Sequence, residues 1–266
     1  MRLIFIRHGD PDYDNDTLTE KGKREAALLA PRIAALQDIR GIYVSPFGRA
    51  QATAAPALAL MGREAVTLPW LREFSYRIED PVTGRKHVPW DLLPEYYTRE
   101  PAFFNREKWY EAPLYKTNPE IGENAPLVMQ GFDDLMASWG YERQRRAAYY
   151  HVNDSEKTLI RADVRPRYCH EDHPEDRDDT LLFFCHLGAE LFLVGYLLGI
   201  SPVLLWQGVY LAPTAVTVLN EERRHGNNAA FRIQVLGDVS HLTAGGEPVS
   251  YSGAFGPILQ EPPMPK

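Results

Sequence analysis

The chain has 266 residues, of which 44% are hydrophobic, and a net charge of −7 from 29 basic and 36 acidic side chains. That length suits one well-filled core, and the acidic balance excludes nucleic acid and anionic membranes as main partners. Two cysteines make no disulfide framework and no secretory signal precedes the first apolar run, so the sequence predicts a cytoplasmic protein.

The first 73 residues follow the pattern of a β-α-β-α unit. Thr19 is a suitable N-cap for the first helix, and Ser45-Pro46 opens the second. The expected elements are a strand at 3–6, a polar loop at 10–16, a helix from Thr19 to about 36, a strand at 42–44, a helix from Ser45-Pro46 to about 60 and a short strand at 66–68.

The middle of the chain, roughly 75–175, is richer in tryptophan, tyrosine, proline and charged residues of both signs. Helical periods occur near 92–97 and, more strongly, near 132–150. Arg143, Arg145 and Arg146 are therefore expected on an exposed helix face. We interpret this region as an insertion that covers a functional site.

The α/β pattern then resumes. The expected elements are a fully buried strand at 180–185, a helix at 189–198, two strands at 215–220 and 231–236, and an irregular tail after Asp238. The longest apolar stretch, near 191–205, is interrupted by glycine and proline and falls short of the roughly 20 residues of a membrane span. We predict one domain over 1–266, with a cap subdomain at 75–175 inserted in it. Its fold class is α/β, a three-layer α/β/α sandwich with a mostly parallel central sheet and the insertion over the C-terminal strand ends.

The tripeptide Arg7-His8-Gly9 follows directly after the first expected strand. Open α/β sheets build their ligand sites at the carboxyl ends of strands, and glycine lets the backbone turn sharply there. An imidazole beside a guanidinium suits phosphate, because the imidazole can attack phosphorus while the planar guanidinium binds its oxygens.

Three more polar side chains are expected at the ends of other elements. They are Arg49 in the first turn of the second helix, Glu73 after the segment 68–72, and His186 at the end of the late strand. If all of them share one crevice with Arg7 and His8, the site suits a phosphoryl group, whose transition state spreads negative charge over three oxygens.

Taken in order, these motifs resemble the histidine phosphatase superfamily, which includes the cofactor-dependent phosphoglycerate mutases. The matching segments are Arg7-His8-Gly9, Leu18-Thr19-Glu20-Lys21-Gly22, the stretch 45–54 (SPFGRAQATA), Leu71-Arg72-Glu73 and Cys185-His186-Leu187-Gly188. The similarity covers about 1–75 and 180–240, and the middle region matches only loosely.

The resemblance implies a role for each site residue. His8 would be the nucleophile that becomes a phosphohistidine, and Arg7, Arg49 and His186 would bind the phosphoryl oxygens, with His186 also counted as catalytic. Glu73 would protonate the leaving oxygen and then activate water. No metal or other cofactor is expected, because the arginines supply the positive charge. The partner is a small-molecule phosphomonoester.

The sequence therefore favours a metal-independent phosphomonoester hydrolase. One alternative is phosphoryl transfer of the phosphoglycerate mutase type, which needs a second anion pocket, but the insertion shows no clear mutase pattern. The other is a non-catalytic protein that binds a phosphorylated ligand. The substrate and the oligomeric state are not predicted.

Some features depart from the family pattern or compete with it. Leu187 replaces the glycine that many members have after the second histidine. The loop 10–16 is more acidic than anion-binding loops usually are, so Asn15 and Thr17 are not counted as phosphate ligands. The segment Cys169–His173 has no spacing typical of a zinc site and is interpreted as a solvated acidic loop. Trp90, Tyr96 and Tyr97 are candidates for the pocket wall.

Overall fold

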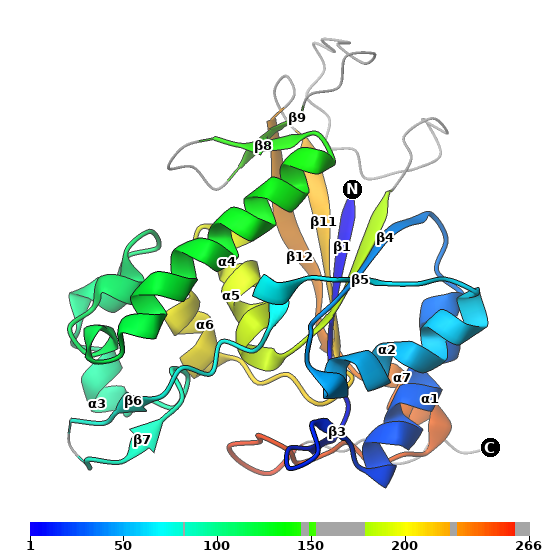
Figure 1. Ribbon diagram of the computed structural model, residues 1–266, viewed down its shortest axis with the longest axis horizontal. Helices are drawn as coiled ribbons and strands as arrows, with labels where there is room; N and C mark the ends of the chain where they lie inside the picture. Colours follow the sequence, from blue (N-terminus) through cyan, green and yellow to red (C-terminus); the bar gives the residue numbers. More distant parts are fainter. Residues whose placement is uncertain (82, 145–148, 153–178, 224–227, 259–266) are drawn as a thin grey trace.

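A computed structural model describes residues 1–81, 83–144, 149–152, 179–223 and 228–258. Its centre is an eight-stranded sheet with the order β5-β4-β10-β1-β11-β12-β9-β8 (Figure 1). The strands of this sheet are β1 (Arg2–Arg7), β4 (Ile39–Val44), β5 (Val66–Thr67), β8 (Tyr141–Arg143), β9 (Tyr150–Val152), β10 (Thr180–Cys185), β11 (Val216–Arg223) and β12 (Asn228–Asp238). Two short hairpins pair β2 (Pro11–Asp12) with β3 (Thr17–Leu18) and β6 (Ile78–Glu79) with β7 (Lys86–His87).

The helices lie between and beside these strands. They are α1 (Glu20–Ala34), α2 (Gly48–Met61), α3 (Pro94–Tyr97), α4 (Pro119–Ser138), α5 (Leu187–Leu198), α6 (Pro202–Gly208) and α7 (Ser240–Gly245). Four short 3₁₀ helices, η1 (Pro69–Leu71), η2 (Pro101–Phe104), η3 (Trp109–Glu111) and η4 (Tyr115–Thr117), connect the middle of the chain. Among the described residues, no helix is long and apolar enough to cross a membrane.

The predicted α/β class is confirmed, and the sheet is mixed. β5, β4, β10 and β1 run parallel, whereas β11, β12, β9 and β8 extend the sheet by antiparallel pairing. In the parallel half, Arg7 is aligned with Cys185 and Phe184 with Val44. The residues that follow β1, β4 and β10 therefore meet at one edge of the sheet.

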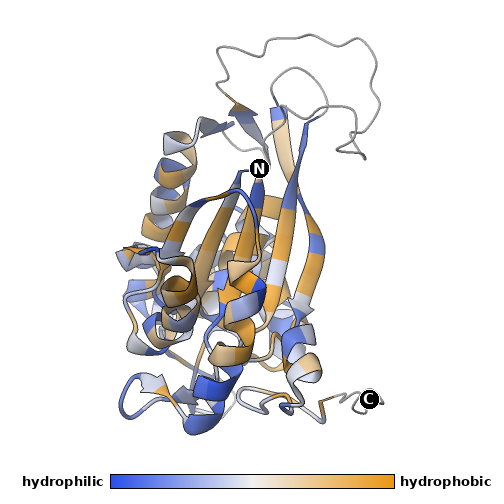
Figure 2. Ribbon diagram, turned by 90° about the vertical axis from the view of Figure 1, so that its right-hand side faces the viewer, coloured by the Kyte–Doolittle hydropathy of each residue, from blue (hydrophilic) through white to orange (hydrophobic). Residues whose placement is uncertain are grey.

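The two faces of the sheet pack into different cores, because successive strand residues point to opposite sides. Ile4 and Ile6 of β1 pack with residues of α1 and α2. Leu3 and Phe5 pack on the other face with residues of α4, α5 and the short helices. Figure 2 shows hydrophobic residues concentrated in the central strands between these helices. Both faces of β1 are thus buried, as its continuous apolar sequence predicts.

The middle of the chain contributes to the same core as the sheet. Trp109 and Phe132 belong to the cluster that contains Phe5 and Phe183. The helix predicted near 132–150 is wrong beyond Ser138, because Gly140 adopts a left-handed φ of 84° and the chain turns into β8. The tail predicted to be irregular after Asp238 contains the short helix α7. The proposed insertion includes 153–178, outside the described residues, and its boundaries stay a prediction.

Candidate active site

His8 directly follows β1, and its backbone is held on both sides. Its N–H donates to Cys185 O (2.9 Å), and its carbonyl oxygen accepts from Thr214 N–H (3.2 Å). The imidazole is 2% exposed, and its Nδ1 lies 2.7 Å from Gly9 O. A carbonyl oxygen only accepts hydrogen bonds, so Nδ1 carries the proton and Nε2 keeps its lone pair. Burial, together with Arg7, lowers the pKa of His8 well below its ordinary value, which keeps the ring neutral.

Arg7 is the last residue of β1, and its buried guanidinium is held by main-chain oxygens. Nη1 donates to Leu211 O, and Nη2 donates to Ser252 O at 3.3 Å. Its Nε is buried and has no hydrogen-bond partner among the described residues. A buried donor without a partner is costly, and a ligand oxygen would satisfy it.

Arg49 occupies the first turn of α2. Its Nη1 donates to Asp16 Oδ1 at 2.6 Å, and the ring of Phe47 lies 4.7 Å from its Cζ. As in Arg7, the buried Nε has no partner within the described part of the chain. Two arginines thus leave a buried N–H unpaired close to His8, and both act electrostatically on its imidazole.

His186 directly follows β10, as His8 directly follows β1. The centres of the two imidazole rings are 5.1 Å apart. His186 Nε2 lies 2.7 Å from Ser45 Oγ, whereas Nδ1 is buried without a partner among the described residues. Burial lowers the pKa of His186 well below its ordinary value, and the charges of His8 and Arg49 lower it further.

Glu73 follows η1 and lies at the N-terminal end of α5. Its Oε1 accepts from Phe74 N–H (2.9 Å) and Ala189 N–H (3.0 Å), and Oε2 accepts from Gly188 N–H (3.4 Å). Burial raises its pKa, and these backbone donors offset part of that effect. A carboxyl group that retains its proton when buried has the property that a general acid needs.

Residues 3–113 match the family model described as the histidine phosphatase superfamily, branch 1. This segment of the chain, which contains Arg7, His8, Arg49 and Glu73, is similar to that superfamily.

Solved structures share the fold of this protein at low sequence identity. Phosphoserine phosphatase from Entamoeba histolytica, in complex with 3-phosphoglyceric acid, is 19% identical with a TM-score of 0.53, covering 91% of this chain and 98% of that one. The mycobacterial glucosyl-3-phosphoglycerate phosphatase with inorganic phosphate is 19% identical with a TM-score of 0.51, covering 90% and 98%. No curated protein matches this chain.

The structure brings the five predicted site residues together. Arg7 and Arg49 act electrostatically on both His186 and Glu73, and His186 is in ring contact with His8. Trp90 lies against the same corner, because a Cβ on Gly188 would meet its ring at 2.3 Å and Glu73 Oε1 at 2.6 Å.

The remaining candidates from the sequence lie elsewhere or have other partners. Asn15 Nδ2 donates to Asp12 (2.8 Å), and Tyr96 packs edge-on against Phe103. Leu187 is buried at the start of α5. The segment Cys169–His173 lies outside the described residues, and the residues that the structure describes contain no group of side chains that could hold a metal ion.

The structure also shows site neighbours that the sequence did not reveal. Ser45 fixes His186, Asp16 binds Arg49, and the carbonyl of Ser252 near the end of the chain binds Arg7. Ser45 stands in the quoted motif and follows β4 at the same edge as His8, which was a usable signal. Nothing in the local sequence of Ser252 indicates its contact with residue 7.

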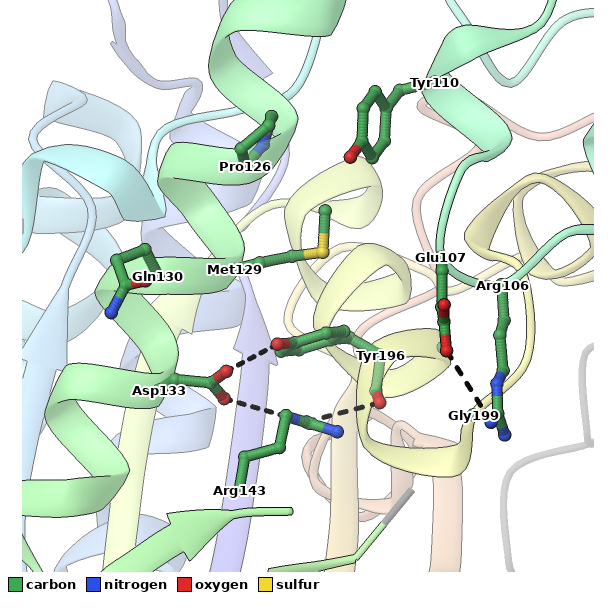
Figure 3. A pocket seen from close by; sticks show the side chains of 11 residues that line it. Arg106, Glu107, Tyr110, Pro126, Met129, Gln130, Asp133, Arg143, Tyr196 and Gly199 are labelled. Atoms are coloured by element: carbon green, nitrogen blue, oxygen red, sulfur yellow. Dashed lines mark hydrogen bonds and ion pairs between the residues drawn. The ribbon is translucent and has the colours of Figure 1, made fainter. Parts of the chain in front are cut away.

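A hollow of about 290 Å³ lies at the other end of α5 (Figure 3). Its floor is made by Asp133 of α4, Arg143 of β8 and Tyr196 of α5. Arg143 Nε donates to Asp133 Oδ1 (2.9 Å), and Tyr196 Oη donates to Asp133 Oδ2 (2.6 Å). The predicted exposed helix face is wrong for Arg143, which is mostly buried in this network because α4 ends before it. Arg145 and Arg146 lie outside the described residues.

Proposed function

We propose that this protein is a histidine phosphatase, a metal-independent phosphomonoester hydrolase that acts through a phosphohistidine on His8. One observation carries the proposal. His8 Nε2 keeps its lone pair, and around this ring Arg7 Nε, Arg49 Nε and His186 Nδ1 are all buried without a partner among the described residues. These groups are the ones that three phosphoryl oxygens around an in-line nucleophile would require.

In the first half-reaction, His8 Nε2 attacks phosphorus and the bond between phosphorus and the ester oxygen breaks. Glu73 gives its proton to that oxygen, which leaves as an alcohol. The two guanidiniums stabilise the charge on the equatorial oxygens. A Ser45 hydroxyl that donates to His186 Nε2 would place the ring proton on Nδ1, so that this histidine donates to the phosphoryl group as well.

In the second half-reaction, the Glu73 carboxylate takes a proton from a water molecule. The resulting hydroxide attacks phosphorus and breaks its bond to His8 Nε2, which releases inorganic phosphate. Glu73 is then protonated and His8 neutral, as at the start. No metal ion enters either step, because Arg7 and Arg49 supply the positive charge.

The proposed substrate class is supported by the number of arginines at the site and by the ligands of the structural neighbours. Two arginines suit a single phosphoryl group, and two structural neighbours are described with 3-phosphoglyceric acid or inorganic phosphate. We propose a small-molecule phosphomonoester as the substrate. Product analysis with 3-phosphoglycerate separates hydrolysis, which yields inorganic phosphate, from a mutase reaction, which yields the isomer.

The test is phosphate release from p-nitrophenyl phosphate and a panel of metabolite phosphomonoesters, with a chelator present. His8→Ala should lower kcat by about 10⁴-fold or more, because the nucleophile is lost. The matched control is His87→Ala, which removes a histidine whose ring pairs with Asp91 in the β6–β7 hairpin region. Full activity in the His8 variant, or loss of wild-type activity with chelator, would contradict the proposal. Mass spectrometry of quenched reactions should find the phosphoryl group on residue 8.

A further inference from the structure

The acidic loop between β1 and α1 has no role in the mechanism above, yet one of its carboxylates reaches the site. Asp16 precedes β3 and adopts a left-handed φ of 46°. Its Oδ1 accepts from Arg49 Nη1 at 2.6 Å, and its Oδ2 accepts from the N–H of Gly48 at 2.7 Å. The Asp16 side chain is 45% exposed, whereas the Arg49 side chain is 10% exposed.

The contact between this loop and α2 is close enough to require glycine at position 48. A Cβ there would lie 2.2 Å from the carbonyl oxygen of Asp16. The loop backbone is therefore pressed against the first turn of α2, and the carboxylate is fixed at two points. A carboxylate fixed in this way orients the guanidinium that it binds better than a flexible carboxylate does.

Two aromatic rings also lie close to the Arg49 guanidinium. Phe47 lies 4.7 Å and Tyr13 lies 5.4 Å from its Cζ, measured to the ring centres. Asp16 binds Nη1, which leaves the edge formed by Nε and Nη2. That edge carries two parallel donors, the arrangement that matches two oxygens of a phosphoryl group. Its Nε is the buried nitrogen that has no partner within the described residues.

We propose that Asp16 is a positioning residue that holds Arg49 by Nη1 and turns its Nε–Nη2 edge toward the phosphoryl group. This inference rests on the proposed function, because it assigns Arg49 to phosphate. It also explains why an acidic loop stands beside an anion site: the carboxylate binds the arginine on the edge that the substrate does not use. The opposite interpretation, in which Asp16 competes with phosphate for Arg49, makes the opposite prediction for phosphate binding.

The experiment compares Asp16→Asn with Asp14→Asn as a matched control. Asparagine tolerates a left-handed backbone, so the Asp16→Asn variant keeps the loop conformation while losing the charge. Asp14 is exposed in the same loop, so the Asp14→Asn variant makes the same change of charge away from Arg49. The readouts are kcat and KM for p-nitrophenyl phosphate, the Kd of inorganic phosphate by calorimetry, and thermal unfolding as a check on folding.

We expect Asp16→Asn to lower kcat/KM and raise the Kd of phosphate by about tenfold, the size of one charge-assisted hydrogen bond. Asp14→Asn should change both by less than about twofold, as expected for an exposed charge. The same Asp16→Asn change is also made in an Arg49→Ala background, where a residue that acts through Arg49 has nothing left to position. There its effect should fall below about twofold.

An equal effect of Asp16→Asn in both backgrounds would overturn the proposal, because Asp16 would then act independently of Arg49. Tighter phosphate binding in Asp16→Asn would overturn it in favour of competition. Failure of the proposed function has a different signature: a wild-type protein that binds phosphate but shows neither turnover nor phosphohistidine. In that case the Kd comparison still decides the role of Asp16. A wild-type protein that binds no phosphate would overturn both.

Discussion

The two ends of helix α5 carry polar clusters that differ in how their atoms are paired. At the N-terminal end, His186 Nδ1 is buried without a partner in the described part of the chain, and Arg7 and Arg49 leave Nε in the same state. At the C-terminal end, Asp133, Arg143 and Tyr196 bind one another (Figure 3). Among the described residues, none of the buried unpaired atoms belongs to this second cluster.

This difference in pairing distinguishes a ligand-binding site from a network that only stabilises the fold. Both clusters combine arginine, a carboxyl group and aromatic rings, and a hollow of about 290 Å³ lies over the second. Pairing among the residues themselves stabilises the fold and leaves a ligand little to satisfy. Unpaired buried donors cost stability and are retained where a ligand supplies the missing acceptor. We therefore expect substitutions at the first end to change activity and substitutions at the second to change stability.

The largest effect in this comparison is expected for Glu73→Gln. An amide cannot give a proton to the leaving oxygen, so kcat for alkyl phosphate esters should fall by about 10²–10⁴-fold. The pKa of Glu73 is raised and that of His8 lowered, so kcat/KM should be highest where Glu73 is protonated and His8 neutral. Activity should fall at alkaline pH as Glu73 ionises and at acid pH as His8 protonates. The pH–rate profile of the variant should lose its alkaline limb.

p-Nitrophenyl phosphate is a useful control for this prediction. Its leaving group is a weak base and needs little protonation, so the loss of kcat in Glu73→Gln should be smaller for this ester than for an alkyl ester. An equal loss on both esters would argue against Glu73 as the general acid.

Glu190, in the first turn of α5 and not used in the proposed mechanism, gives a second prediction, on stability. It is fully buried, and burial raises its pKa from 4.5 to about 8, with the charge of Arg7 acting in the opposite direction. Between pH 4.5 and about 8, Glu190 is therefore protonated in the folded protein and ionised in the unfolded chain. The free energy of unfolding consequently falls as the pH rises through this range. Glu190→Gln should remove that slope and gain on the order of 3 kcal/mol relative to wild type between pH 5 and pH 8.

Urea unfolding of both proteins at several pH values measures this difference. All other titrating groups are shared, so they cancel in the comparison. A constant difference across the pH range would show that Glu190 is ionised in the folded protein and finds a partner that the static structure does not contain.

The sequence indicated correctly that His8 and His186 lie close together, because both residues follow strands. His8 and His186 each stand one residue beyond a strand that reads as a continuous apolar run. Parallel pairing in register then brings these positions together, so three-residue motifs and strand ends were sufficient to place both histidines. The residues that orient them were harder to find. Asp16 reaches Arg49 through one left-handed turn, and Ser252 reaches Arg7 across most of the chain.

The second cluster shows where helical periodicity misleads. The apolar and aromatic pattern near 132–150 is compatible with one long helix, but Gly140 ends α4 and the chain turns into β8. Arg143 then changes from an expected surface residue to a mostly buried one. The local sequence pattern could not indicate that Arg143 is buried, because its partners include Tyr196, which is distant in sequence.

The smallest effect is expected for a substitution in the cluster at the C-terminal end of α5. Asp133→Asn removes the carboxylate that accepts from both Arg143 and Tyr196, and should lower the free energy of unfolding by about 2 kcal/mol, typical of hydrogen bonds to a charged group. The matched control is Asp134→Asn, the next residue of α4, which is exposed and should cost less than about 0.5 kcal/mol. Both variants should keep kcat/KM for p-nitrophenyl phosphate within about twofold, a range that corresponds to less than 0.5 kcal/mol in transition-state stabilisation. A loss of activity in Asp133→Asn without loss of stability would reverse the comparison, since it would mean that this cluster, although internally paired, acts on the phosphoryl site through α5.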